Sequence, residues 1–218
     1  MRKAEPIRLV VFDMDGVLAD VDSSWMFVHQ AFNVSNELNY QRYVRGEIGY
    51  QEFLNSDIRL WGRVTLQRIE EILAEIPLMP GAEETVKALK LRKVKTAIIS
   101  SGLEPLAKRI QRELTIDHVY ANRLLVDEDG FLTGEGEALV EPKEKLKVLM
   151  EVSSRLGLRL SECAVVGDSL FDIPMLKAAG VGIAFNPKDK EVSEAADFVV
   201  EEKNLKAVLP PIFQAQIR

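Results

Sequence analysis

Short runs of apolar residues alternate along this chain with longer stretches in which apolar residues recur every three or four positions. The short runs are nearly continuous in Val, Ile, Leu and Phe, which is typical of strands covered on both faces of a sheet. Strands that alternate with helices indicate βαβ units, so we predict an α/β fold with a doubly wound, Rossmann-like parallel sheet. The predicted strands are Ile7–Phe12, Thr96–Ile99, Ala164–Val166, Gly182–Phe185 and Phe198–Val200.

The stretches between these strands predict amphipathic helices. Gly157 and Gly180 directly follow two of them, and glycine at that position commonly ends a helix in the left-handed conformation. We therefore expect both glycines to be left-handed C-caps. The helices are expected at Glu83–Lys93, along the apolar stripe of Leu106, Ile110 and Leu114, at Glu144–Leu156, and at Phe171–Ala179.

Residues 20–79 break the alternation, because they have helical periodicity and no convincing strand. This segment holds eight of the fifteen aromatic residues, which we expect to pack a small core. We predict two domains: an α/β core formed by residues 1–19 and 80–218, and a small helical domain, residues 20–79, inserted after the first strand.

A second interruption lies between Tyr120 and Thr133. The sequence Asp127-Glu128-Asp129-Gly130 separates two short apolar runs, Leu124-Leu125-Val126 and Phe131-Leu132. Turn-forming residues between two such runs predict a β-hairpin.

Composition narrows the function classes only broadly. The chain has 218 residues, 47% of them hydrophobic, with a net charge of −6. The acidic balance argues against binding to nucleic acid, and no apolar run is long enough to span a membrane. The single cysteine, Cys163, cannot form an internal disulfide, and Met1 to Pro6 lead into a strand without a secretory apolar segment, so we expect a cytoplasmic protein.

Candidate chemistry begins at the end of the first strand. Asp13 and Asp15 are two residues apart, so both carboxylates can face one centre while Gly16 permits a tight turn. A calcium loop of the EF-hand type requires further acids that Val17 and Leu18 do not provide. Ligands in open α/β sheets bind beyond the carboxyl ends of strands, so we interpret this pair as part of a site.

Ser100, Ser101 and Gly102 follow the second strand and precede a helix. Exposed N–H groups at a helix start, with a serine hydroxyl, can hold a phosphate, and we assign that role to Ser100 within this turn. Ser101 and Gly102 belong to the same candidate phosphate-binding turn. Ser101 and Glu104 also form a capping-box pattern, with Pro105 in the first turn, so we expect Ser101 to cap the helix, and both roles can hold together.

Two lysines and two further acids complete the candidate set. Lys145 shares a helix face with Leu149 and Val152, whereas Lys143 does not, so Lys145 is the better candidate to point toward the sheet. Asp168 follows the third strand and can join Asp13 in holding a hard cation. Asp172, one helical turn later, can orient Asp168 or a metal-bound water, although an acid in a first turn is also simply favourable there.

Together these residues resemble the motifs of the haloacid-dehalogenase-like phosphohydrolases. The motifs are Asp13-Met14-Asp15-Gly16, Ser100-Ser101-Gly102, a helix-borne lysine, and an aspartate pair at 168 and 172, in the family's order over nearly the whole chain. Within that family, the hairpin around residues 120–134 and the stretch at 173–185 resemble the phosphoserine phosphatases.

The resemblance implies a mechanism. Asp13 would form an aspartyl-phosphate, and Asp15 would protonate the leaving alcohol and then activate water. It also implies Mg²⁺ held by Asp13, the Asp15 carbonyl, Asp168 and waters, with Ser100 and Lys145 neutralising phosphate charge. The inserted helical domain would be a cap that closes over the site.

The chain departs from the phosphoserine phosphatases at three places. Ser169 and Phe171 replace a glycine and an asparagine of the fourth motif. Asp22 is the nearest match to an acid that meets the substrate's ammonium group. An ungapped alignment puts Asp57 where an arginine would meet the carboxylate, with Arg59 two residues away.

We therefore expect a Mg²⁺-dependent phosphomonoester hydrolase acting on a small phosphorylated metabolite, with phosphoserine as one candidate. Its partner would be that small molecule, with no nucleic acid or membrane, and the protein would be a monomer or homodimer. Two alternatives remain: a phosphotransferase or phosphomutase of the same family, and a non-catalytic protein that binds phosphate or a partner.

Overall fold

The computed structural model describes residues 6–214. Residues 1–5 and 215–218, the two ends of the predicted core domain, lie outside this range. The expectation that the N-terminus has no secretory segment therefore concerns mainly residues outside the description. The strands are β1 (Leu9–Phe12), β2 (Lys95–Leu103), β3 (His118–Val126), β4 (Leu132–Glu137), β5 (Cys163–Gly167), β6 (Val181–Phe185) and β7 (Phe198–Val200).

The α-helices are α1 (Ser24–Ala31), α2 (Glu37–Val44), α3 (Tyr50–Leu60), α4 (Leu66–Ala74), α5 (Ala82–Leu91), α6 (Glu104–Leu114), α7 (Lys145–Arg155), α8 (Ile173–Ala178), α9 (Lys190–Ala195) and α10 (Leu209–Gln214). Short 3₁₀ turns lie at η1 (Pro142–Glu144), η2 (Leu160–Glu162), η3 (Leu170–Asp172) and η4 (Leu205–Val208). Within residues 6–214, no helix combines the length and the apolar character needed to cross a bilayer.

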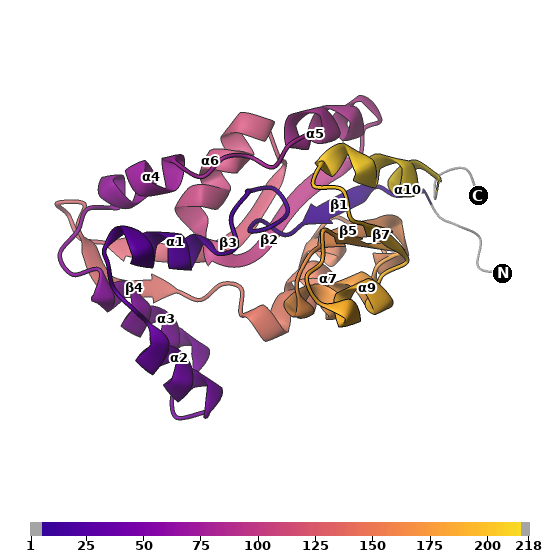
Figure 1. Cartoon of the computed structure of the whole chain (residues 1–218). Coiled ribbons are helices and arrows are strands. Elements are labelled where there is room, and N and C mark those ends of the chain that lie inside the picture. Colours follow the sequence, from indigo (N-terminus) through magenta and orange to yellow (C-terminus); the bar gives the residue numbers. More distant parts are fainter. Residues whose placement is uncertain (1–5, 215–218) are drawn as a thin grey trace.

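The seven strands form one sheet in the order β4-β3-β2-β1-β5-β6-β7 (Figure 1). All neighbours are parallel except β3 and β4, which form the predicted hairpin. The predicted α/β fold is confirmed. Because the chain leaves β1 toward β2 on one side and reaches β5 on the other, the carboxyl end of β1 is the switch point where such sheets bind ligands.

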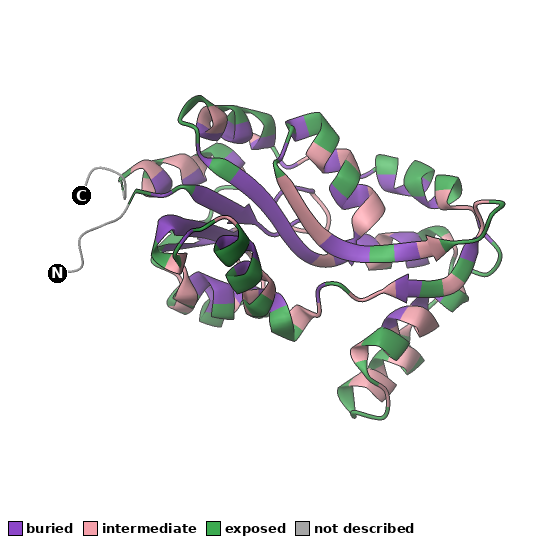
Figure 2. Cartoon of the chain, turned by 180° about the vertical axis from the view of Figure 1, so that it is seen from behind, coloured by how far each residue is buried: buried purple, intermediate pink, exposed green. Residues whose placement is uncertain are grey.

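Both faces of the sheet are covered, as the apolar strands predict. Successive side chains of β1 point to opposite faces, so Val10 and Phe12 pack with one core cluster and Leu9 and Val11 with the other. Helices α5, α6 and α10 cover the first face, and α7, α8 and α9 cover the second. Figure 2 shows the central strands buried along their length.

The segment 20–79 is helical, as predicted, but its helices occupy two places. Helices α1 and α4 pack against each other, and α4 also packs on α6 of the sheet layer. Helix α3 packs on β4, and α2 packs on α3, so this pair forms a lobe that projects beyond the sheet (Figure 1). The lobe stands beside the strand ends.

Two cap predictions are wrong. β2 continues through Ser100, Ser101 and Gly102, and the N-cap of α6 is Leu103, so Ser101 does not cap that helix. The C-cap of α8 is Ala179 in an extended conformation, and Gly180 after it is not left-handed. A Cβ there would overlap the carbonyl of Ser161, so the glycine permits a close backbone approach instead. Gly157 is left-handed, as predicted.

Candidate active site

Side chains from three adjacent strands meet at the switch point. Asp13 directly follows β1, Ser100 lies near the end of β2, and Asp168 directly follows β5. Asp13 and Ser100 are almost completely buried, and Asp168 is half-buried. The parallel pairing of β1 with both neighbours brings these strand ends to one edge of the sheet, where the sequence analysis expected a site.

Lys145 is the cation of this site. Its Nζ donates to Asp13 Oδ2 at 2.6 Å and to Asp172 Oδ1 at 2.8 Å, and the side chain is buried. Lys143 is exposed, with its Nζ 5.8 Å from the centre of the Tyr43 ring. The helix-face argument that favoured Lys145 therefore agrees with the structure.

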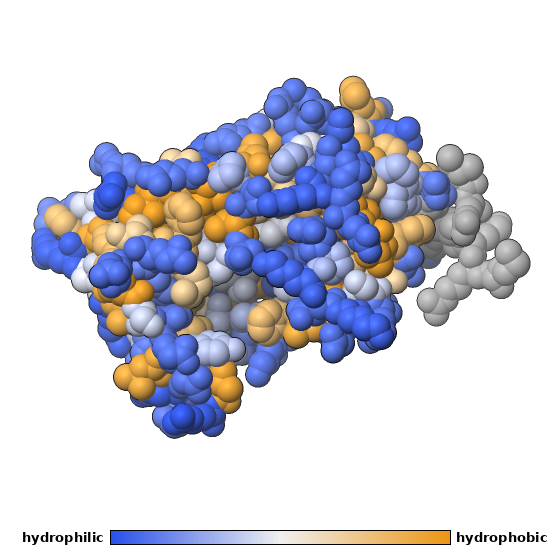
Figure 3. All heavy atoms as spheres, in the orientation of Figure 1, coloured by the Kyte–Doolittle hydropathy of each residue, from blue (hydrophilic) through white to orange (hydrophobic). Residues whose placement is uncertain are grey.

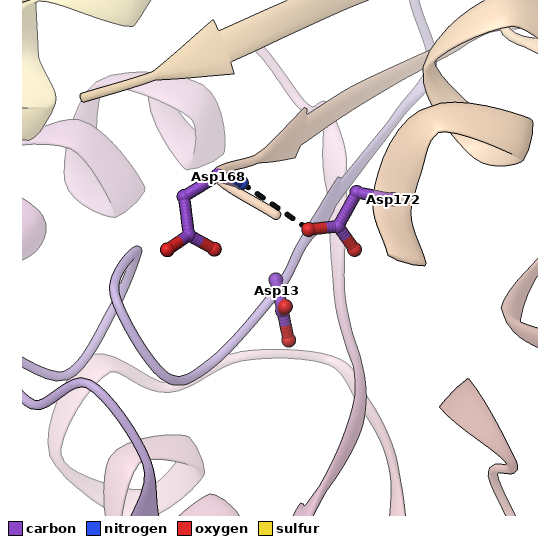
Figure 4. A group of neighbouring side chains, drawn as sticks. All are labelled: Asp13, Asp168 and Asp172. Carbon is purple, nitrogen blue, oxygen red and sulfur yellow. Dashed lines mark hydrogen bonds between the residues drawn. The ribbon is translucent and has the colours of Figure 1, made fainter. Parts of the chain in front are cut away.

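Asp172 positions its neighbours. While its Oδ1 accepts from Lys145, its Oδ2 accepts from the backbone N of Asp168 at 3.2 Å, and from the N and Oγ of Ser169 at 3.1 and 2.9 Å. Figure 4 shows Asp172 reaching the backbone of Asp168 in this way. Asp172 therefore fixes both the lysine and the turn that carries Asp168.

Asp13, Asp168 and Asp172 have carboxylate oxygens within 4.8 Å of one another, as a metal site requires. A carboxylate has about four acceptor positions, and Asp172 already accepts four hydrogen bonds. Asp13 accepts only two, from Met14 N on Oδ1 and from Lys145 Nζ on Oδ2, both at 2.6 Å, so Asp13 and Asp168 are the acids best placed to hold a cation. Gly16 is left-handed and faces the Asp168 carboxylate so closely that a Cβ would overlap it. The Asp15 carboxylate is not part of this group.

Burial and crowding of like charges raise two pKa values in this cluster. The pKa of Asp13 is raised to about 7, mainly by burial and then by the charge of Asp172, which together outweigh the opposing effect of Lys145. The pKa of Asp168 is raised to about 8 by burial and by the charges of Asp13 and Asp172. Burial alone would lower the pKa of Lys145, but the two adjacent carboxylates raise it. The cluster carries more acid than one lysine compensates, which suits a divalent cation.

Asp15 faces the helical segment rather than the metal cluster. Its Oδ2 accepts from the backbone N and from the Oγ of Ser24, both at 2.8 Å. Its Oδ1 is buried without a hydrogen-bond partner among the described residues. Burial raises the pKa of Asp15, despite these two hydrogen bonds, so this carboxyl can retain a proton that an ordinary aspartate would lose.

The Ser100-Ser101-Gly102 segment lies against Asp15. Ser100 Oγ accepts from the backbone N of Gly102 at 3.1 Å. A Cβ on Gly102 would lie 2.8 Å from Ser24 Oγ and 3.0 Å from Asp15 Oδ2, so only glycine fits between them. The Ser101 carbonyl accepts from Trp25 Nε1 at 3.0 Å and from Asn122 Nδ2 at 2.8 Å.

The substrate-binding candidates lie apart from each other. Asp22 is exposed and pairs with Lys188 at 2.5 Å. Arg59 is exposed on α3, pairs with Glu52 at 3.0 Å, and packs against Gly134 of the hairpin. Neither residue lines the pocket between the lobe and the strand ends, whereas Asp57 does.

Sequence reasoning missed Ser24 and Asn122. Ser24 is buried and contacts Asp15, but nothing in the local sequence distinguishes it from any serine at a helix start. Asn122 is buried within β3 and joins Ser101, Tyr50 and Val140. A polar residue inside an apolar strand was a usable signal, since buried amides need partners.

Comparisons with known proteins agree with this geometry. The sequence model of the haloacid dehalogenase-like hydrolases matches residues 7–180. The phosphoserine phosphatase of Methanocaldococcus jannaschii is 32% identical over 206 residues, which are 93% of this chain and 96% of that protein. The phosphoserine phosphatase of Archaeoglobus fulgidus is 33% identical over 91% of this chain, which spans only 58% of that relative.

A solved substrate-bound phosphoserine phosphatase complex is similar in fold. Its TM-score is 0.78 at 28% identity, covering 94% of this chain and 98% of the other. Phosphoserine phosphatases are phosphoric monoester hydrolases. The chain is therefore an enzyme that belongs to the haloacid dehalogenase-like hydrolases and is similar to the phosphoserine phosphatases.

Proposed function

We propose that this protein is a Mg²⁺-dependent phosphomonoester hydrolase that works through an aspartyl-phosphate on Asp13. The observation that carries the proposal is the buried Asp13 carboxylate, held by Lys145 at 2.6 Å beside Asp168 at the sheet's switch point. A neighbour of the same fold, described as a phospho-aspartyl intermediate analogue of phosphoserine phosphatase, supports it (TM-score 0.78, 28% identity).

In the first step, a carboxylate oxygen of Asp13 attacks phosphorus, and the bond from phosphorus to the leaving oxygen breaks. Lys145 orients the Asp13 carboxylate and its charge favours the ionised, nucleophilic form. Lys145 also places positive charge beside Asp13, where the phosphoryl oxygens would gather, and Ser100 would bind one of those oxygens.

Asp15 would supply the proton that the leaving alcohol needs. Burial raises its pKa, and Ser24 holds one carboxyl oxygen while the other is without a partner among the described residues. Such a group can donate a proton to the leaving oxygen and afterwards accept one from the water that attacks the aspartyl-phosphate.

The residues present fit magnesium. Mg²⁺ prefers one or two carboxylates with substrate phosphate and water, and Asp13 with Asp168 provide that set. When bound, the ion supplies positive charge against the phosphoryl oxygens and the crowded carboxylates. The backbone carbonyl of Asp15, which the family resemblance implies as a ligand, would be a further ligand of the ion.

We further assign residues 20–79 as the cap domain and the remaining described residues as the core. The α2–α3 lobe stands over the pocket that ends at Ser101, so it is placed to exclude water and select the leaving group. Phosphoserine, named by the relatives, is the first substrate to assay.

The test is hydrolysis of p-nitrophenyl phosphate with and without Mg²⁺, followed by a panel of phosphorylated metabolites that includes phosphoserine. We expect Mg²⁺-dependent release of phosphate. If no phosphate is released with Mg²⁺, the alternative of a non-catalytic protein that binds phosphate or a partner is favoured. Adding a sugar-phosphate acceptor should not reduce the free phosphate released, whereas a phosphotransferase would pass the group to the acceptor.

A further inference from the structure

The pocket beside Ser101 has a chemistry of its own. It is a cavity of about 380 Å³ lined by residues of α1, α2 and α3, with Pro142 and Phe171 from the core side. In Figure 3 a recess opens between the lobe, at the lower left, and the body of the molecule. Pockets of this size take ligands larger than a serine side chain.

Aromatic rings form one wall of this pocket. The rings of Tyr43 and Phe53 stack with centres 5.0 Å apart, and Tyr40 and Tyr50 tilt against Phe53 at 6.3 and 6.2 Å. Trp25, which also lines the pocket, stacks on Trp61 at 5.5 Å. Because each ring is supported by another, the wall is formed before any ligand arrives, which lowers the entropic cost of binding.

The polar ends of three of these rings already have partners. Tyr43 donates to Glu141, Tyr50 accepts from Asn122, and Trp25 donates to the Ser101 carbonyl. The rings therefore offer a ligand mainly apolar surface.

The charged groups that line the pocket are acids, Glu37 and Asp57, and no described lining residue is Lys or Arg. Asp57 is buried and accepts from Asn36 at 2.7 Å and Asn39 at 3.0 Å. The third donor is His29 Nε2 at 3.2 Å.

That histidine is neutral. The Trp61 indole can only donate, and it donates to His29 Nδ1 at 2.8 Å, so the ring's hydrogen lies on Nε2 and points to Asp57. No cation within this network offsets the negative charge of Asp57. A ligand carboxylate in this pocket would meet like charge and no lysine or arginine among the described lining residues, which costs affinity.

We propose that this pocket selects a leaving alcohol with a bulky apolar, preferably aromatic, body and without a carboxylate. The inference rests on the proposed phosphatase function and names the substrate class of the same site. The carboxylate of phosphoserine, the substrate in the relatives' names, finds no described lysine or arginine in this pocket lining, although its ammonium group could face Glu37 or Asp57.

The first test compares kcat/KM for three alkyl phosphates: 2-phenylethyl phosphate, phosphoethanolamine and phosphoserine. We expect 2-phenylethyl phosphate to exceed phosphoserine at least ten-fold. Phosphoethanolamine, which lacks the carboxylate, should lie between them. Equal or better turnover of phosphoserine overturns the inference even where p-nitrophenyl phosphate is hydrolysed normally.

The second test reads binding without turnover. Calorimetric titration of the Asp13→Asn variant with the same esters in Mg²⁺ should show the same order of affinity. A protein that binds phosphoserine most tightly contradicts the inference, whatever its activity. If the unaltered protein hydrolyses none of these esters while the variant keeps this binding order, only the proposed function is contradicted.

Two matched pairs of variants locate the preference. Tyr40→Ala should lower the ratio of kcat/KM for 2-phenylethyl phosphate to kcat/KM for phosphoserine about five-fold. Leu38 is exposed on the same helix outside the pocket, so Leu38→Ala should not change this ratio. Glu37→Gln should lower the same ratio about three-fold by raising kcat/KM for phosphoserine, with Glu47→Gln as its control. A ratio that is the same in all four variants places the preference elsewhere and refutes the assignment.

Discussion

The strand-end site and the lobe pocket lie next to each other, but the first consists of buried charged groups and the second mainly of aromatic rings. At the strand ends, charged groups are buried and joined at 2.6 to 2.8 Å, as between Lys145, Asp13 and Asp172. In the lobe, half-exposed rings on short helices offer apolar surface, as with Tyr40 and Phe53.

This contrast suits two separate roles, phosphoryl transfer at the strand ends and recognition of the leaving group in the lobe. Charges held at the ends of a rigid sheet can stabilise the developing charge of phosphoryl transfer, which is the same for every ester. The leaving group differs between esters, and in the proposed function it would meet side chains on the lobe that do not hold the sheet together. On this proposal the reaction and the choice of substrate depend on different parts of the chain, and the following changes test that separation.

Replacing Asp13 with Asn should have the largest effect. An amide is a poor nucleophile, so we expect kcat for p-nitrophenyl phosphate to fall by about 10³-fold or more. Steady-state assays in Mg²⁺ measure this, with Asp129→Asn in the exposed hairpin turn as the control. Retained activity in Asp13→Asn would exclude the covalent mechanism.

Lys145→Met should lower both activity and stability. It leaves the buried carboxylates of Asp13 and Asp172 without their cation, and breaking a buried pair costs about 3–5 kcal/mol. Urea denaturation without metal measures the free energy of unfolding. Lys143→Met, on the exposed neighbour, should change it by less than about 0.5 kcal/mol. Equal effects of the two variants would contradict the assignment of Lys145.

Mg²⁺ should stabilise the folded protein. An ion that binds only the folded state at a concentration 100-fold above its Kd adds about 2.7 kcal/mol, so the melting temperature should rise on adding Mg²⁺ and fall back with a chelator. In Asp168→Asn the rise should be strongly reduced, whereas Asp189→Asn should keep it. A full rise of the melting temperature in Asp168→Asn would mean that the cation binds at another place.

Asp57→Ala should destabilise the lobe without removing the catalytic groups. It leaves donors on His29, Asn36 and Asn39 unsatisfied, at a cost of about 1–3 kcal/mol. Hydrogen exchange should show faster opening in α2 and α3 and little change in β1 and β5. Uniform loss of protection across the sheet would mean that the lobe and core do not behave as separate regions.

Asp22→Ala and Arg59→Ala should have the smallest effects. Both residues sit in exposed ion pairs, which contribute little, and neither lines the pocket. We expect the urea midpoint and the KM for phosphoserine to stay unchanged in either variant. A marked rise in KM for Arg59→Ala would instead support its role in binding a carboxylate.

Much of the fold follows from local pattern. Apolar runs such as Leu9–Phe12 form strands because both of their faces are buried, and their polar successors necessarily reach the sheet edge. Local pattern failed where a tertiary contact decided the backbone. β2 continues to Leu103 because it keeps pairing with β3 after a register shift, which removes the cap expected at Ser101.

The sequence by itself determined the α/β class, the helical segment between the first two strands, and the set of acids that could react. Only the tertiary structure joined Lys145 to Asp13, 132 residues away, and Ser24 to Asp15. It alone also assembled an aromatic, acidic pocket from three helices and the core. Periodicity records which face of an element is buried, but it carries no information about which distant element will cover that face.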